Sequence, residues 1–214
     1  MPRYPHSHKT STRSRILGAA EAIIKDRGPG AATVEAVMRR AGLTVGGFYA
    51  YFPSKEALAQ QALLEGVRRS FERLTDGLDD ALPERFARAL IDRYLSQADA
   101  ASLETACPLT LLLPEVARSD ASFRDAFAMQ TSAMVATVEH RLPKVEGMAP
   151  REVALAMFAS LAGGIAFAHA AATLRGRHRI VESTRASLYR WLALDDTTEV
   201  TLPDGPRPTG TAVE

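Results

Sequence analysis

Apolar residues recur at helical spacing along most of the chain, whereas alternating β-branched runs bounded by turns are nearly absent. Positions 16, 17, 20, 23 and 24 form one apolar face before Gly28, and positions 64, 67, 71, 74 and 78 form another. Side chains three, four and seven residues apart lie on the same side of a helix, so each set can be buried against a neighbouring element. The sequence therefore predicts an all-α fold.

Two short helices are expected after the helix that ends before Gly28. Thr33 can cap the first of them, which ends at Gly42, and Thr44 can cap the second, over residues 45–51. A short helix, a turn through a glycine and another short helix form the helix-turn-helix pattern. Ser54 can then cap a long fourth helix, which we expect the N-terminal unit to share with the rest of the chain.

Charge divides the chain unevenly. Through residue 60 there are nine Lys or Arg and four Asp or Glu, against 17 and 21 in the remainder. A basic first quarter indicates contact with a polyanion, although a chance excess on a solvated face gives the same count. We expect a helix-turn-helix domain over residues 10–57 and a larger helical regulatory and dimerisation domain over 58–196, with a disordered basic arm at 1–9 and a disordered tail at 197–214.

The segment 42–55, Gly-Leu-Thr-Val-Gly-Gly-Phe-Tyr-Ala-Tyr-Phe-Pro-Ser-Lys, is unusual for a purely structural helix. Gly46 and Gly47 each cost about 1 kcal/mol relative to alanine in a helix, but they let the backbone approach the surface of a ligand closely. Tyr49 has a phenol that can reach a phosphate or a base edge. Lys55 begins the next helix, where free backbone N–H groups already favour an anion.

Residues 12–65 closely resemble the DNA-binding domain of the tetracycline-repressor (TetR) family, above all Phe-Tyr-Ala-Tyr-Phe-Pro-Ser-Lys-Glu-Ala-Leu at positions 48–58. The resemblance covers about a quarter of the chain. It implies an all-α dimer with a three-helix DNA-binding domain and a larger helical regulatory domain. In that family an effector usually binds the regulatory domain and releases DNA, and repression is the usual outcome.

By match of position, the resemblance also implies which residues touch DNA. The family often has His where this chain has Tyr51, and a polar residue where it has Val45. Tyr51 can still donate to a phosphate, whereas Val45 has no side-chain hydrogen-bonding group. The implied DNA contacts are Thr33, Thr44, Gly47, Tyr49, Tyr51 and Lys55.

The regulatory part contains fewer chemical signals. We expect a mostly apolar small-molecule effector among the helices of residues 83–174, where large aromatic residues and Met lie on several helices. Among these candidates, only Tyr94 and His169 have polar side-chain groups that can hydrogen-bond to it. The alternative interpretation of these positions is a packed core. For His169 the alternative is an interior histidine whose hydrogen bonds are made within the protein. The candidate lining residues are Phe86, Leu90, Tyr94, Leu112, Phe127, Met134, Phe158 and His169.

Cys107 is the single cysteine. The run 107–118 looks like a subgroup of the family in which some members sense electrophiles or oxidants through a cysteine, so Cys107 is a possible redox switch; the alternative is a small core residue. One cysteine excludes an intrachain disulfide framework and a Cys-rich metal site. Together with a polar, basic N-terminus without an apolar signal region, it favours a cytoplasmic location.

Residues 153–174 contain no Asp, Glu, Lys or Arg. Twenty-two such residues can span a bilayer by length, but Ala, Gly, Ser and Thr make up much of this segment and its drive into lipid is weak. A helix buried among other helices has the same character. We expect no membrane partner; instead, residues 153–174 and a helix over 178–194 should pair with those of a second copy in a four-helix interface.

An enzyme and a helical interaction module that does not bind DNA are the alternative classes. The sequence has no metal-ligand spacing, no phosphate-binding glycine loop and no Gly-x-Ser-x-Gly motif, so we expect no catalytic site and no cofactor. The basic first quarter and the aromatic-lysine segment favour DNA. The sequence therefore predicts a cytoplasmic, ligand-responsive transcriptional regulator, with repression as the usual sense, that binds palindromic operator DNA as a homodimer.

Overall fold

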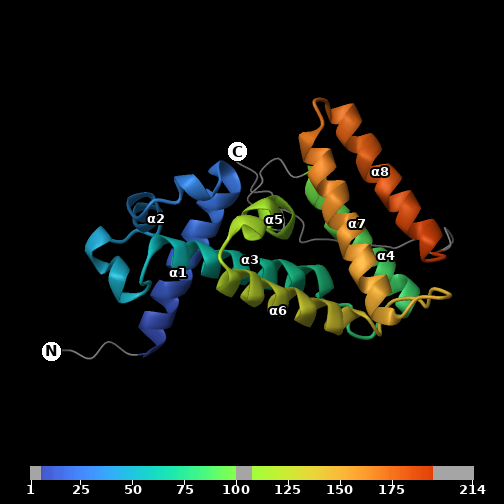
Figure 1. Ribbon diagram of the computed structural model, residues 1–214, viewed down its shortest axis with the longest axis horizontal. Helices are drawn as coiled ribbons and strands as arrows, with labels where there is room; N and C mark the ends of the chain where they lie inside the picture. The colour runs from blue at the N-terminus through green and yellow to red at the C-terminus, as the bar shows by residue number, and fades with distance from the viewer. Residues whose placement is uncertain (1–5, 100–107, 195–214) are drawn as a thin grey trace, which may run out of the picture.

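The computed structural model describes residues 6–99 and 108–194, and within them every regular element is a helix, which confirms the all-α class. The N-terminal unit runs from α1 into the first turns of a long helix, α3 (Figure 1). Its elements are α1 (His6–Arg27), the 3₁₀ turn η1 (Pro29–Ala31), α2 (Val34–Arg40), the 3₁₀ helix η2 (Val45–Ala50) and the start of α3 (Lys55–Thr75).

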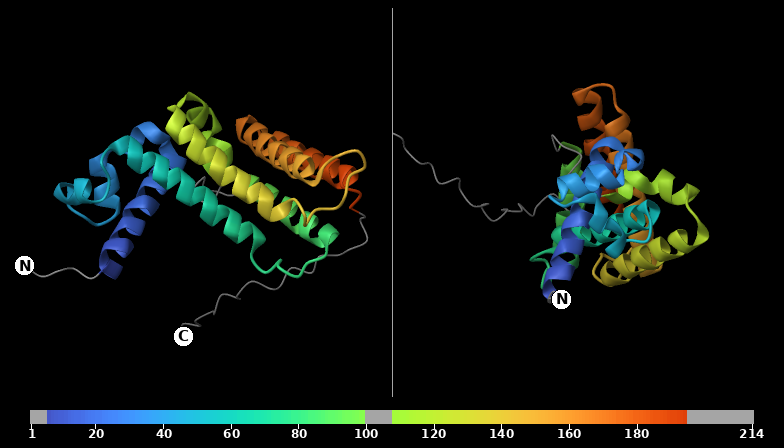
Figure 2. Two further views of the ribbon diagram at one scale, coloured as in Figure 1. Left: turned by 60° about the horizontal axis from the view of Figure 1, so that its bottom comes forward. Right: turned by 90° about the vertical axis from the view of Figure 1, so that its left-hand side faces the viewer.

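A larger helical unit follows α3. Figures 1 and 2 show α7 and α8 side by side at the end of the molecule opposite α2. The elements of this unit are α4 (Pro83–Leu95), the 3₁₀ turn η3 (Ser96–Asp99), α5 (Pro108–Arg118), α6 (Ala121–Val138), α7 (Pro150–Ala170) and α8 (Leu174–Trp191).

Helix α3 belongs to both units. Ser54 caps it as expected, because its hydroxyl accepts the N–H of Ala57 at 3.1 Å. The helix packs against α1 and also against α4, α5 and α6. Its 21 residues correspond to about 30 Å of rigid rod, so a tilt of α3 in the larger unit must move the N-terminal unit as well.

The boundaries of the N-terminal helices differ from the expectation in two places. Helix α1 begins at His6, so residues 6–9, which we expected to be disordered, are helical. Residues 45–50 form a 3₁₀ helix instead of an α-helix. Gly46 and Gly47 explain the second difference, because two successive glycines remove the propensity that a short α-helix needs.

The long uncharged segment also divides differently. Helix α7 ends at Ala170, and Leu174 already belongs to α8, which begins before the expected residue 178. Thr173 causes the break, since it is extended and its hydroxyl accepts the N–H of Gly176 at 3.0 Å. A new helix capped in this way cannot continue the previous one.

Helix α7 is the one helix in residues 6–99 and 108–194 that is long and apolar enough to cross a membrane by length and composition. It packs against α4, α5, α6 and α8, and Met157, Leu161 and Ile165 are buried there. This is the environment of a core helix. Its other face carries small residues together with Leu155 and Phe167, which are 50% and 70% exposed.

Candidate nucleic-acid interface

The turn between α2 and η2 is held by a glycine and by an arginine of α1. Gly42 has a φ of 68°, in the left-handed region that only glycine adopts without strain. The N–H of Leu43 donates to the carbonyl of Met38 at 2.9 Å, and the Arg15 guanidinium donates to the carbonyl of Ala41 at 2.5 Å. The turn therefore has a fixed geometry relative to α1.

Two phenylalanines anchor η2 to the core of the N-terminal unit. Phe48 and Phe52 are fully buried, and their ring centroids lie 5.9 Å apart. The Arg13 guanidinium lies over the Phe52 ring at 5.3 Å. Tyr49 meets the Phe48 ring edge-on, with centroids 5.2 Å apart. The inner side of η2 is thus fixed by aromatic packing.

The outer side of η2 is bare. Tyr49 is 72% exposed and Val45 is 46% exposed, both unusually high for large apolar side chains. Residues three apart eclipse one another on a 3₁₀ helix, so Gly46 lies in line with Tyr49. The result is a small convex surface with one phenol, one branched apolar side chain and uncovered backbone between them.

Within the part of the chain that the structure describes, nothing requires glycine at positions 46 and 47. Neither residue has a positive φ. A Cβ atom added at Gly46 would meet nothing within 4 Å, and one at Gly47 would meet only the Met38 methyl at 4.0 Å. Packing among the described residues therefore does not explain these two glycines, whereas close approach of a partner to the backbone would.

The remaining sequence-derived candidates surround η2. Thr33 is exposed and caps α2 by accepting the N–H of Ala36 at 3.2 Å. Thr44 is exposed but its hydroxyl makes no cap hydrogen bond, so the expected capping role is wrong. Tyr51 is half-buried against the core.

Lys55 has a partner that the sequence did not indicate. Its ammonium donates to the carbonyl of Gly30 in η1 at 3.4 Å. Since η1 leads directly into the cap of α2, this contact brings the Lys55 charge to the side of the unit where Thr33 lies. The lysine and the start of α2 therefore form one polar edge beside η2.

Sequence reasoning missed two basic residues of this face. Arg39 and Arg40 form the last turn of α2 and are exposed. Both contribute to the excess of Lys and Arg before residue 60, but they do not stand at positions for which the family resemblance implies a DNA contact. They add positive charge next to the turn that precedes η2.

The candidate effector-lining residues lie mainly in the core of the larger unit. The Tyr94 and Thr110 hydroxyls are 2.8 Å apart in the interior. Phe127 is partly buried against the same core. The side chain of Leu112 and the whole of Cys107 lie outside the described part of the structure. The buried candidates are Phe86, Leu90, Tyr94, Met134 and Phe158.

His169 is the remaining polar candidate, near the end of α7. Burial lowers its pKa below the ordinary value, and the positive charge of Arg177 lowers it further. Its Nδ1 atom is buried and makes no hydrogen bond within the described residues. None of the eight candidates lines the pocket where the N-terminal unit meets α5 and α6, the pocket at the α6–α7 connection or the pocket at the end of α8.

Known proteins resemble this chain in two ways. Residues 16–62 match the family model described as bacterial regulatory proteins, tetR family. The HTH-type transcriptional regulator UidR of Escherichia coli K12 is 34% identical over 68 residues, which are 32% of this chain and 35% of UidR. The chain therefore matches about a third of the length of that curated relative.

Solved structures resemble the whole fold. A TetR transcriptional regulator from Chloroflexus aurantiacus J-10-fl superposes with a TM-score of 0.64 at 22% identity, covering 86% of this chain and 97% of that protein. The reduced form of E. coli NemR gives a TM-score of 0.69 at 20% identity, covering 82% and 96%. The arrangement of an N-terminal unit on a larger helical unit is thus shared with these regulators.

Proposed function

We propose, from the match of residues 16–62 to the model of bacterial regulatory proteins, tetR family, that the protein is a homodimeric transcriptional regulator that binds operator DNA through η2. The observation that carries this proposal is the outer surface of η2, where Tyr49 and Val45 are exposed beside two glycines that the fold does not need. A groove-reading element requires such a surface.

Each residue of this face has a distinct role in the proposal. Val45 supplies an apolar contact for a thymine methyl group in the major groove, and Tyr49 supplies a hydroxyl for a base edge or a phosphate. Gly46 and Gly47 let the η2 backbone approach the groove. Thr33, Thr44, Tyr51 and Lys55 contact phosphates on either flank, with Arg39 and Arg40 adding long-range attraction.

Tyr49→Phe and Lys55→Ala are expected to weaken operator binding by about 1 kcal/mol per contact, with thermal stability nearly unchanged. Operator affinity measured by fluorescence anisotropy at several salt concentrations distinguishes the two variants. Lys55→Ala should flatten the slope of log affinity against log salt by about one per half-site, and Tyr49→Phe should not. Lys144→Ala is the matched control, since Lys144 is exposed in the larger unit; equal slopes for the two lysine variants would remove Lys55 from the phosphate contacts.

Gly46→Ala is expected to separate stability from binding. The added methyl group has room in the free protein, so the free energy of unfolding should stay constant or rise by up to about 1 kcal/mol. Gly46 is exposed on the same side of η2 as Tyr49. Operator affinity should fall at least about tenfold, which corresponds to roughly 1.4 kcal/mol, because the methyl group stands between the backbone and DNA. Gly18→Ala in α1 is the control, as its methyl group also has room. Unchanged affinity in Gly46→Ala would refute close approach.

The dimer in this proposal forms through α7 and α8. The exposed face of α7 combines small residues with Leu155 and Phe167, and Leu174 at the start of α8 is 78% exposed. Small residues allow a second helix to come close, and the large side chains supply apolar area. A four-helix interface of this kind would hold two η2 helices about 34–36 Å apart, one turn of B-DNA.

Ligand response is the last part of the proposal. We assign the effector to the larger unit, among the aromatic and Met side chains of α4, α6 and α7, with Tyr94 and His169 as polar groups. Because most of these side chains are buried, an effector must displace them, and this repacking would tilt α3 and release the operator. Reciprocity gives the test: operator DNA must weaken effector binding by the factor by which the effector weakens operator binding.

A further inference from the structure

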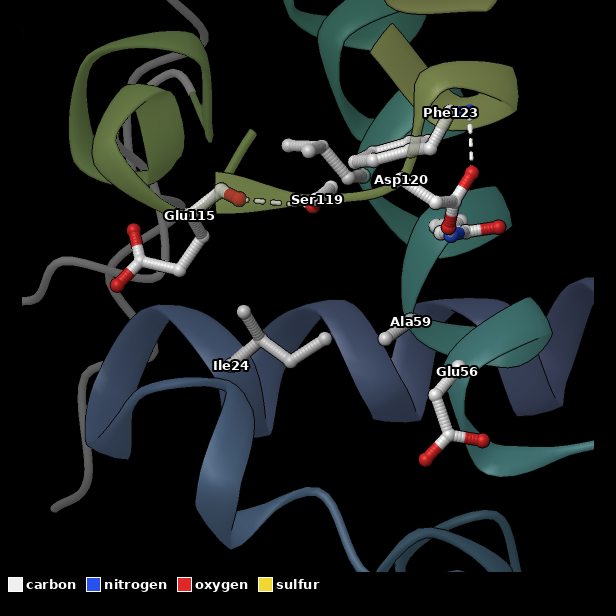
Figure 3. A pocket seen from close by; sticks show the side chains of 9 residues that line it. Ile24, Glu56, Ala59, Glu115, Ser119, Asp120 and Phe123 are labelled. Atoms are coloured by element: carbon white, nitrogen blue, oxygen red, sulfur yellow. Dashed lines mark hydrogen bonds between the residues drawn. The ribbon is translucent and has the colours of Figure 1, made fainter. Parts of the chain in front are cut away.

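A cavity of about 270 Å³ lies where the N-terminal unit meets α5 and α6 (Figure 3). Four parts of the chain line this junction pocket: α1, the first turns of α3, the end of α5 and the start of α6. None of the residues proposed above for DNA or effector binding belongs to it. The lining residues are Ile24, Glu56, Ala59, Gln60, Leu63, Glu115, Ser119, Asp120 and Phe123.

The wall of the junction pocket is apolar. Ile24, Leu63 and Phe123 are each at most 5% exposed. Figure 3 shows Ile24 and Phe123 on opposite sides of the space, with the Ala59 methyl group to one side. Apolar cavities of about 150 Å³ in protein interiors exclude water and take up a benzene ring. The junction pocket therefore has room for an aromatic ring and its substituents.

The carboxyl groups at the edge of the junction pocket do not face its space. Figure 3 shows them on different sides, each turned away from the apolar wall: Glu56, Glu115 and Asp120. The Glu115 side chain is 38% exposed and pairs with Arg118 at 3.3 Å, and Glu56 is exposed at the start of α3. These two charges stay in contact with solvent, so they do not select a ligand for the cavity.

Other polar groups of the lining residues make hydrogen bonds within the protein. Asp120 accepts the N–H of Phe123 at 2.9 Å and the side-chain amide of Gln60 at 3.0 Å. The Ser119 hydroxyl donates to the carbonyl of Glu115 at 2.7 Å. A charged ligand would therefore lose its hydration in the cavity without gaining a partner, whereas a neutral apolar ligand would gain dispersion contacts with the wall.

We propose that the junction pocket binds a small, neutral aromatic molecule, whose ring lies against Ile24, Leu63 and Phe123. Only the consequence for DNA rests on the proposed function. The cavity is built from both units, and the hydrogen bond between Gln60 of α3 and Asp120 at the start of α6 crosses the same boundary. A ring held there acts on the placement of α3 relative to α6, and so changes operator affinity.

Calorimetric titration of the full chain without DNA tests the site with three probes that share one ring. Toluene is neutral, benzylammonium carries a positive charge and benzoate carries a negative one. We expect toluene to bind at least about tenfold more tightly than either ion. Intermolecular nuclear Overhauser effects from the toluene ring should appear at the methyl groups of Ile24 and Leu63, which line the cavity.

Three variants test whether the cavity is the site of binding. Ala59→Leu fills the cavity and should weaken toluene binding at least about tenfold. Ala136→Leu adds the same side chain at an exposed site of α6 and should change nothing. Glu115→Gln should also leave toluene affinity unchanged, because this carboxyl group is turned away from the ring. If Ala59→Leu proves unfolded by circular dichroism, the smaller Ala59→Val replaces it, with an expected loss of at least about threefold.

Four results would overturn the proposal: absent toluene binding, equal binding of toluene and either ion, equal effects of Ala59→Leu and Ala136→Leu, or Overhauser effects that exclude Ile24 and Leu63. Operator affinity with and without toluene tests the consequence, and we expect it to change at least about fivefold; an unchanged affinity would overturn that coupling. Toluene binding without DNA binding would refute the proposed function and leave the site standing, whereas DNA binding without toluene binding would do the reverse.

Discussion

Replacing Ala159 by Arg should convert the protein into a monomer and reduce operator affinity by at least about 100-fold. Ala159 is exposed on the free face of α7, where the proposed partner helix has no room for a long charged side chain. Burying an unpaired guanidinium there is strongly unfavourable. Loss of the dimer removes one of two linked DNA contacts, and bivalency is worth about 10²–10⁴ in affinity.

Light scattering at micromolar concentration measures the oligomeric state, and circular dichroism verifies the fold. Ala136→Arg is the control, because Ala136 is exposed on α6 and should tolerate the change. Ala162 would be a poor choice on α7, since it is only 6% exposed and faces its own core. A dimeric Ala159→Arg with normal operator binding would contradict the proposed interface.

Gly164→Ala should destabilise the protein by about 1–3 kcal/mol, although it adds a single methyl group in a helix. The Cβ atom would lie 2.7 Å from Oγ1 and 2.8 Å from Cγ2 of Thr184 in α8. Thr184 cannot turn away easily, because it is β-branched and its hydroxyl donates to the carbonyl of Ile180 at 2.9 Å. The substitution therefore forces α7 and α8 apart.

The double variant Gly164→Ala with Thr184→Ala identifies the cause. Removing both γ atoms of Thr184 should restore most of the lost free energy of unfolding, measured by urea titration. Gly163→Ala is the matched control, since a Cβ atom there meets nothing within 4 Å. If the double variant is no more stable than Gly164→Ala, the glycine is not set by α8.

The sequence predicted the local features well, because each depends on residues close together in the chain. The caps at Thr33 and Ser54 and the shared helix α3 follow from spacing and side-chain chemistry within a few turns. The wrong prediction of a cap at Thr44 also concerns residues close together in the chain. The first turn of a 3₁₀ helix does not place its free N–H groups where the hydroxyl of a threonine at the cap position can accept their hydrogen bonds.

The features that escaped prediction depend on contacts between distant segments. A pocket where the N-terminal unit meets α5 and α6 brings residue 24 together with residues 56–63 and 115–123, and no local sequence pattern indicates this contact. The contact between Lys55 and Gly30 escaped prediction for the same reason, because the two residues are 25 positions apart in the chain. The apolar positions of α4, α6 and α7 could be assigned to helices, but their spacing does not distinguish a packed core from a ligand chamber.

Fluorescence anisotropy with DNA from upstream of the protein's own gene, titrated at several salt concentrations, measures operator binding itself. We expect a specific complex with two chains per site, whose log affinity falls linearly with log salt and whose slope is reduced in Lys55→Ala. Binding that is absent, or equally strong to unrelated DNA at every salt concentration, would contradict this expectation.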